Sequence, residues 1–307
     1  MNVSSLLPPL LALTLAPLLL GVTNRTKALF AGRAGAPLFQ LYYDLWKLLR
    51  KGTVYSEVTT WVFRAGPVVS LAAMLAAIAL VPLGGCLSPI SFQGDLLLLA
   101  YLLGLARLFT VLAALDTGSP FEGMGASREV LFSALAEPAL VLGLAAVSRE
   151  MGSISLSGIN QAISIHVWVH SGLVLGLVAV VLMIVFLTEN SRIPVDDPNT
   201  HLELTMIHEV MVLDHGGPDL AFILYGAALK LWILGSLIVG LVIPFHFGIP
   251  VLDLPVAVAG MIALAVVLGV IESTMARLRM MRVPELLIGA VTLAGLALVL
   301  EHGGVVS

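Results

Sequence analysis

Eight long apolar stretches constrain this chain more than any other feature of its sequence. A helix needs roughly 20 apolar residues to cross the hydrocarbon core of a bilayer. The stretches occupy residues 3–22, 65–84, 94–115, 129–149, 168–189, 220–243, 250–272 and 284–301. They are long and do not alternate strictly between apolar and polar residues, which favours helices over the strands of a barrel. The sequence therefore predicts an all-α polytopic membrane protein, with residues 1–307 forming one membrane domain of about eight transmembrane helices.

The composition supports a membrane location. Only 11% of the residues are charged and 59% are hydrophobic, with a mean hydropathy of +1.05. A soluble domain usually carries about 25% charged residues, so lipid must cover much of this surface. No basic tail or face suits a nucleic acid. The single cysteine, Cys86, excludes an internal disulfide and an all-cysteine metal or iron–sulfur site.

The basic residues predict the orientation in the membrane. Most of the 15 lysines and arginines lie in the odd-numbered loops, whereas only Arg149 lies in an even-numbered loop. Arg107 and Lys230 lie within spans. Because cytoplasmic loops carry the excess of Lys and Arg, we expect the odd-numbered loops to be cytoplasmic and both termini to lie on the outer face.

Two of the predicted cytoplasmic loops stand out, one by an amphipathic pattern and one by its acidic residues. Residues 37–51 place leucines and a tyrosine at helical spacing, which predicts an amphipathic helix lying on the membrane or against a partner. Residues 189–219 form a long acidic loop with seven Asp and Glu residues. In the third loop, Gly118, Gly123 and Gly125 are expected to form turns.

Ionisable residues inside the spans are the strongest functional signal, because charge within a bilayer is costly. They are Arg107, Glu129, Glu137, Glu189, Lys230 and Glu272. Glu129, Ser133 and Glu137 are spaced four apart and therefore share one side of the fourth span. Carboxyl groups in such positions suit a proton path. The alternative is a structural one, in which the acids pair with Arg107 or Lys230 or extend toward the headgroups.

Two histidine-containing patterns do not predict a metal site. His208-Glu209 begins like a zinc-protease helix, but Val212 stands where the second histidine belongs. His201 and His208 are therefore interpreted as polar residues of a loop or interface. No nucleotide-binding glycine motif is present in the sequence.

Several segments together resemble subunit 1 of respiratory complex I and its relatives in energy-converting group 4 [NiFe] hydrogenases. The segments that carry the resemblance are Leu115–Phe121, Gly125–Glu129 with Glu137-Pro138, Glu189–Asp196 and Glu272–Arg279. The hydrogenase branch fits better, since these strings are similar to the membrane subunits of formate hydrogenlyase and hydrogenase-4 complexes.

The resemblance implies roles for individual residues. Acidic groups leading from the redox arm into the membrane match Glu129, Glu137, Glu189 and Glu203, and Asp214 and Glu272 complete the predicted proton relay. The predicted junction with the redox arm comprises Arg33, Gln40, Asp44, Lys47, Arg128, Arg192, Asp196, Arg277 and Arg279. No catalytic residue is expected in this chain.

The resemblance also implies partners and location. We expect a non-catalytic subunit of an oxidoreductase complex in the plasma membrane of a prokaryote. Its partners would be a hydrogenase-like large subunit, an iron–sulfur small subunit and antiporter-like membrane subunits. The [NiFe] and iron–sulfur centres would lie in those partners, with no cofactor bound by this chain.

One departure from complex I bears on quinone binding. Where complex I has a Glu-x-Glu-x-Glu-Leu motif, this chain has Asn199, His201 and Glu203-Leu204. The change falls where complex I builds its quinone chamber, and so it speaks against a bound quinone. Three alternatives remain open: a quinone-site subunit of a complex I-like enzyme, an autonomous ion carrier and a purely structural anchor.

Overall fold

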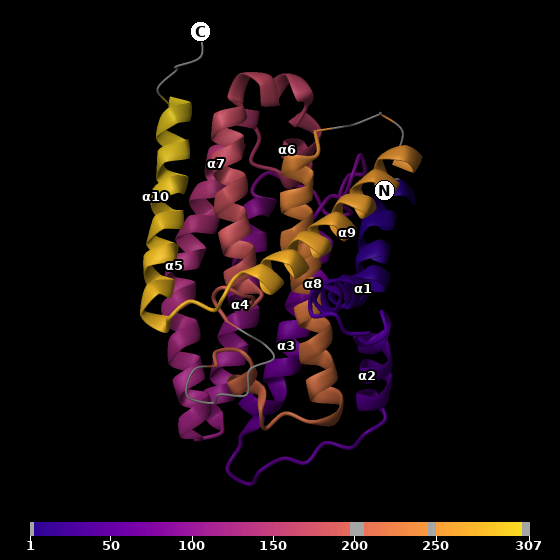
Figure 1. The fold of residues 1–307 in the computed structure, drawn as a ribbon, viewed down its shortest axis with the longest axis vertical. Helices are drawn as coiled ribbons and strands as arrows, with labels where there is room; N and C mark the ends of the chain where they lie inside the picture. Colours follow the sequence, from indigo (N-terminus) through magenta and orange to yellow (C-terminus); the bar gives the residue numbers. More distant parts are fainter. Residues whose placement is uncertain (1–2, 197–205, 245–247, 249, 303–307) are drawn as a thin grey trace.

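The computed structural model describes residues 3–196, 206–244, 248 and 250–302, and this part of the chain is a bundle of helices without a strand (Figure 1). Eight of its helices are long and apolar enough to cross a membrane. They are α1 (Leu7–Phe30), α3 (Trp61–Ile78), α4 (Asp95–Asp116), α5 (Pro120–Met151), α7 (Ile165–Glu189), α8 (Gly217–Val242), α9 (Pro250–Thr274) and α10 (Val283–His302). The predicted all-α polytopic membrane fold is confirmed.

Five shorter helical segments connect or flank these spans. They are η1 (Val3–Leu6), α2 (Gln40–Leu49), α6 (Leu156–Ala162), η2 (Glu209–Val212) and η3 (Met280–Arg282). The helix α2 lies inside the range 37–51 for which the leucine spacing predicts an amphipathic helix. None of its residues is fully buried, and its exposed side chains include Tyr43 and Trp46.

Helix α8 lies at the centre of the bundle and packs against α1, α2, α3, α7 and α9. Helix α9 crosses the bundle obliquely, whereas α10 stands upright against α5 and α7 (Figure 1). Leucine, valine and alanine side chains fill the interior. Large apolar side chains such as Leu108, Val169 and Leu173 remain exposed on the outside. Apolar exteriors of this kind suit contact with lipid or with other membrane helices.

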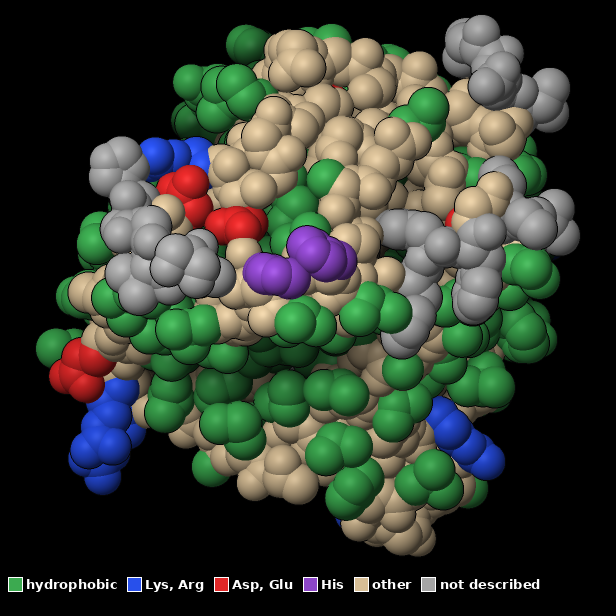
Figure 2. Space-filling model, turned by 90° about the horizontal axis from the view of Figure 1, so that it is seen from above, with side chains coloured by type: hydrophobic (Ala, Val, Ile, Leu, Met, Phe, Trp, Pro, Cys, Tyr) green, Lys and Arg blue, Asp and Glu red, His purple; other side chains and the backbone are tan. Residues whose placement is uncertain are grey.

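The two ends of the bundle differ in charge. The start of α1 and the end of α10 lie in the upper half of Figure 1, and the loops that carry most of the basic residues lie in the lower half. Figure 2 views the top end, where hydrophobic and uncharged atoms dominate and few lysines or arginines are visible. The end with the basic loops is called the basic end below. The asymmetry is the one expected for a protein with a single fixed orientation in the membrane.

Two helices extend well beyond the apolar stretches that predict them. Helix α1 continues to Phe30 rather than ending near residue 22, and α5 begins at Pro120 rather than near Glu129. A hydropathy pattern stops at the first polar residues, but a polar residue does not break the backbone hydrogen bonds of a helix. The start of α5 is fixed instead by Pro120 in its first turn, after Gly118 in a left-handed conformation. Gly123 and Gly125 therefore lie inside α5, and the expectation that they form turns is wrong.

A proline in α1 creates the docking point for α2 and α8. Pro17 has no N–H, so the carbonyl of Leu13 loses its helical hydrogen-bond donor. The hydroxyl of Tyr225 in α8 donates to this carbonyl at 2.8 Å. The hydroxyl of Tyr42 in α2 donates to the neighbouring carbonyl of Thr14. Two tyrosines from other helices thus satisfy carbonyl groups near the proline and hold three helices together.

Gly21 makes this docking possible, and its replacement is our first prediction. A Cβ atom at Gly21 would stand 2.0 Å from the backbone oxygen of Leu38, just before α2. Gly21→Ala should therefore lower the free energy of unfolding by about 1–3 kcal/mol, the usual range for overpacking, measured as a lower Tm in detergent. The control is Gly289→Ala in α10, where nothing lies within 4 Å and alanine should be neutral or stabilising. Equal Tm values for the two variants would contradict the prediction.

Candidate functional site

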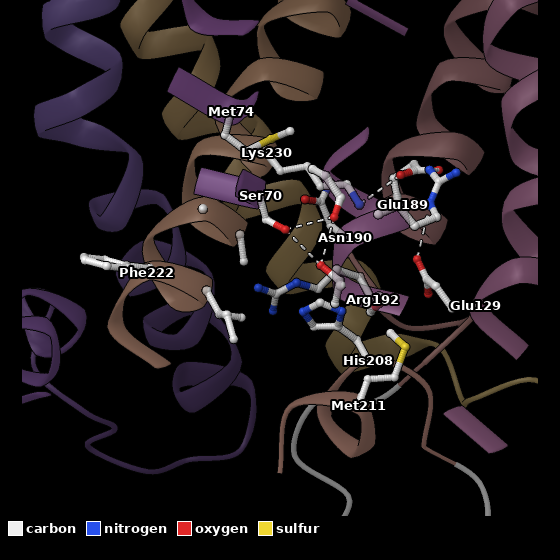
Figure 3. Close-up of a pocket in the computed structure, with 17 residues that line it drawn as sticks. Ser70, Met74, Glu129, Glu189, Asn190, Arg192, His208, Met211, Phe222 and Lys230 are labelled. Carbon is white, nitrogen blue, oxygen red and sulfur yellow. Dashed lines mark hydrogen bonds and ion pairs between the residues drawn. The ribbon is translucent and has the colours of Figure 1, made fainter. Parts of the chain in front are cut away.

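Four helices bring charged side chains together inside the bundle. Arg107 of α4 forms ion pairs with Glu137 of α5 and with Glu189 of α7, and its Nε lies 3.5 Å from Oε1 of Glu129 in α5. Lys230 of α8 pairs with Glu189 through an Nζ–Oε2 distance of 2.9 Å. These five residues are called the central cluster below. Figure 3 shows most of it from one side.

The central cluster is held by compensation between opposite charges. The side chains of Arg107 and Glu189 are 7% and 4% exposed, so water screens neither charge well. A buried ion is tolerated only when an opposite charge and hydrogen bonds replace its hydration. Three carboxyl groups face only two cations in the cluster, so with all five groups ionised it carries an excess negative charge. An excess proton is the simplest way to remove that charge.

A cavity of about 90 Å³ lies against the cluster. A single water needs about 10–15 Å³ of such space, so the cavity has room for several water molecules. Its polar and charged lining residues, most of them labelled in Figure 3, are Ser70, Arg107, Thr110, Glu129, Glu189, Asn190, Ser191, Arg192, His208 and Lys230. Apolar side chains, among them Met74, Met211 and Phe222, also line it. Such a space can carry protons through water between titratable side chains.

A second ionic group adjoins the cavity. Glu272 of α9 is paired with Lys27 of α1 through a 2.7 Å contact, and with Arg192 through Nη1–Oε1 at 3.3 Å. The side chain of Glu272 is fully buried, whereas that of Arg192 reaches the cavity wall. Arg192 therefore links the pair at α1 and α9 to the central cluster through the cavity.

Neutralising Glu272 tests how much this ionic group contributes to the stability of the fold. Glu272→Gln leaves Lys27 and Arg192 without their common anion, so we expect the free energy of unfolding to fall by roughly 3–5 kcal/mol, as when a buried pair loses one partner. Thermal unfolding of the purified chain in detergent measures this as a lower Tm. The control is Glu57→Gln in the exposed stretch before α3, which should leave the Tm unchanged. A Glu272→Gln variant as stable as the control would show that Glu272 does not stabilise the fold by compensating Lys27 and Arg192.

The fifth and seventh loops are fastened to each other and to α5. Nη2 of Arg277 lies 2.9 Å from Oδ1 of the buried Asp196, whose Oδ2 accepts the backbone N–H of Ile207 at 3.1 Å. Nη1 of Arg128 donates to the carbonyl of Met206 at 2.9 Å. Gly125 of α5 has no Cβ, so the backbone of Ile207 can approach closely. The segment that carries His208 is therefore fixed against the bundle.

Comparison with known proteins identifies the family. A family described as NADH dehydrogenase matches residues 4–302. The chain belongs to this family. The predicted resemblance to subunit 1 of complex I and its superfamily is thereby confirmed.

Two members of the family are clear relatives of this chain. Formate hydrogenlyase subunit 4 of Escherichia coli (strain K12) is 32% identical over 289 residues, which cover 92% of each chain. Hydrogenase-4 component C of the same organism is 32% identical over 291 residues, covering 93% of this chain and 91% of the relative. The predicted kinship with the hydrogenase branch of the family is confirmed.

A solved structure supports the fold. A chain of the membrane-bound sulfane sulfur reductase, an archaeal respiratory membrane complex, superposes with a TM-score of 0.82 at 21% identity. The match covers 97% of this chain and 98% of the other. At this identity the likeness establishes the shared arrangement of helices and no more.

This family member places its predicted relay acids in three different settings. Glu129, Glu137 and Glu189 meet at Arg107, and Glu272 lies one ion pair away from the cavity. Asp214 is exposed and does not line the cavity; its backbone N–H donates to Oε1 of the buried Glu122 at 3.3 Å. Glu203, like His201, lies outside the described residues. A relay role for these acids remains a prediction.

The predicted junction residues gather at the basic end. Arg33 is exposed after α1, Gln40 donates to Asp44 within α2 at 3.0 Å, and Lys47 is exposed in the last turn of that helix. Arg279 immediately precedes η3. Arg128, Arg192, Asp196 and Arg277 are already bound within the chain, as described above. Their polar groups are engaged within the chain, so they contribute to the structure of this end more than to direct contacts with a partner subunit.

Sequence reasoning did not assign a site role to several residues of this region. Arg107 and Lys230 are among the ionisable span residues that the sequence marks as functional candidates, but the predicted relay contains only acids; both cations line the cavity. His208 was interpreted as a loop residue, and it also lines the cavity. For the two cations, their position within spans was an available signal. Nothing in the sequence marks His208, because its place depends on how the fifth loop folds back. Within the described residues, no group of three or more His, Cys, Asp and Glu side chains could hold a metal ion.

Proposed function

We propose that this chain is the membrane-anchor and proton-coupling subunit of a group 4 [NiFe]-hydrogenase-like complex. The observation that carries the proposal is the central cluster, in which three carboxyl groups and two cations from four spans meet beside a cavity with room for water. The kinship with formate hydrogenlyase subunit 4 and hydrogenase-4 component C supplies the type of complex. The [NiFe] and iron–sulfur centres would lie in a large and a small partner subunit.

The charge asymmetry of the bundle supports an orientation. The positive-inside rule places the basic end in the cytoplasm and both termini on the outer face. For a prokaryotic complex the membrane is then the plasma membrane. The redox arm docks at the basic end, where Arg277 of the seventh loop is partly exposed and is paired with the buried Asp196 of the fifth loop.

The proposed mechanism is electrostatic coupling. A change of charge in the docked arm alters the potential at the cavity, and a proton then moves onto or off a carboxyl group of the central cluster. Arg107 responds because it is shared by Glu129, Glu137 and Glu189, so neutralising one acid strengthens its pairing with the others. Coupling of this kind between two sites typically amounts to about 1–3 kcal/mol.

The exposure of Glu137 supports a path by which the charge signal passes sideways from the central cluster to a neighbouring membrane subunit. Its side chain is 48% exposed on the flank of α5, although the residue lies in the middle of a span. A carboxylate facing lipid there would be strongly disfavoured. We therefore expect an antiporter-like membrane subunit to cover this flank and to receive the charge signal.

Isolation of the native complex tests the proposal. The chain is purified from its own membrane in mild detergent, and the proteins that accompany it are identified by mass spectrometry. A hydrogenase-type large subunit with nickel-binding cysteines, together with an iron–sulfur small subunit, would support it. A quinone-linked set of subunits, or a chain that purifies alone and carries ions in liposomes, would overturn it.

A further inference from the structure

We infer that His208 exchanges protons between the fifth loop and the central cluster. This inference rests on the proposed function and deepens it, since it names the residue through which the basic end reaches the buried acids. The geometry that carries it is the position of His208 in the cavity wall, on a loop segment fixed to the basic end and sharing that cavity with Glu129, Glu189 and Lys230. Figure 3 shows the imidazole beside Arg192, on the side of the cavity formed by the fifth loop.

The backbone next to His208 is connected to the surface by a short series of contacts. The amide of Ile207 is bound to Asp196, and Asp196 is bound to Arg277 of the seventh loop. Arg277 is 21% exposed at the basic end, whereas Asp196 is 4% exposed. A partner subunit that displaces Arg277 would weaken the charge compensation of the Asp196 carboxylate and would shift the segment that carries His208.

His208 shares the cavity with charged groups of the surrounding elements, which are Arg107 of α4, Glu129 of α5, Glu189 of α7, Lys230 of α8 and Arg192 of the fifth loop. Among the nearby charges, Lys230, Arg192 and Asp196 shift its pKa. Burial, together with the cations Lys230 and Arg192, lowers the pKa of His208 to about 4, against the opposing effect of Asp196. The imidazole is therefore neutral at pH 7 in this state. Because Asp196 favours the imidazolium, releasing Asp196 from Arg277 would raise the pKa of His208 and favour proton uptake.

The proton transfer itself is simple. When His208 becomes an imidazolium, one ring N–H gives its proton to water in the cavity, and a proton passes to the carboxylate of Glu129. Glu129 is the natural acceptor because its contact with Arg107 is a single one at 3.5 Å, whereas Glu189 is bound by both Arg107 and Lys230. The ring returns to its neutral form, and a proton from the basic end restores the imidazolium.

The test uses the intact complex in liposomes, with protons pumped and electrons transferred measured together. We expect His208→Gln to reduce protons pumped per electron by at least about tenfold, since a positioned acid–base group typically contributes 10²–10⁴-fold. Electron transfer should stay within about twofold of wild type, because the redox centres lie in other subunits. The matched control is His215→Gln. His215 is in the same loop but stacks on Phe63 at 3.9 Å and does not line the cavity, so pumping should be unchanged.

A chemical rescue separates proton exchange from a structural role. In His208→Ala, added imidazole should restore pumping, whereas pyrazole, which has the same size but is a much weaker base, should not. Equal rescue by both molecules would mean that the ring only fills space and would overturn the inference. If His208→Ala does not assemble, His208→Gln decides the matter.

Failure of the inference and failure of the proposed function give different results. A wild-type complex that transfers electrons without pumping would refute the proposed function. A wild-type complex that pumps, with His208→Gln pumping equally well, would refute only the role of His208.

Discussion

Arg107→Gln should destabilise this protein at least as strongly as Glu272→Gln. It removes the one cation that contacts Glu129, Glu137 and Glu189, and it leaves Lys230 as the only positive charge of the central cluster. Removing one partner of a buried pair typically destabilises a protein by about 3–5 kcal/mol, because the remaining charge is left uncompensated. We expect a markedly lower Tm, followed in detergent through the fluorescence of the protein's 4 tryptophans.

Two further variants define the cause of this loss. Arg33→Gln removes an exposed arginine of the first loop and should leave the Tm unchanged. Combining Arg107→Gln with Glu189→Gln removes one buried negative charge together with the cation, and part of the lost stability should return. An Arg107→Gln variant with the Tm of wild type would show that Arg107 does not hold the cluster.

Glu137→Gln should have the largest effect on function with little effect on assembly. The amide keeps the shape of the side chain and can still hydrogen-bond near Arg107, which retains Glu189 as its buried partner. Gln cannot carry a proton or a negative charge. In liposomes containing the whole complex, we expect protons pumped per electron to fall by roughly tenfold or more, which corresponds to a typical coupling energy of about 1–3 kcal/mol. The partner subunits should co-purify as in wild type.

A control on the same helix distinguishes position from charge. Glu150 lies near the other end of α5 and accepts a hydrogen bond from Ser171, far along the helix from Arg107. Glu150→Gln removes the same charge and should leave pumping intact. Unchanged pumping by a well-assembled Glu137→Gln complex would argue that the acids of the central cluster serve only assembly.

The elements that sequence reasoning predicted well are those set by local physics. Each span depends on the length of an apolar run against the thickness of a bilayer, so the existence of eight spanning helices followed from the sequence. The ends of α1 and α5 did not, because polar residues such as those between Pro120 and Glu129 can continue a helix that the hydropathy pattern ends. For α5, a proline in the first turn marks the start of the helix better than hydropathy does.

The candidate site was predictable in its acids and not in its arrangement. The spacing of Glu129 and Glu137 placed them on one side of α5, and both do contact Arg107. The predicted relay also contains Asp214, which no helical spacing places, and this residue lies exposed at the loop surface. A loop has no helical period, so no simple rule predicts which of its side chains turn inward.

From the amino-acid sequence alone it follows that this chain crosses a membrane repeatedly, that its basic residues gather at one end, and that ionisable groups lie within its spans. These properties depend on composition along each segment, and each can be evaluated without knowing the segment's neighbours. Three features emerge only from the packing of the helices. Arg107 contacts three acids, and Arg192 pairs with Glu272 while also lining the cavity. His208 lines the same cavity because the fifth loop folds back against the bundle. A buried charge must find its compensation across the gaps between helices, and those gaps exist only after the bundle has packed.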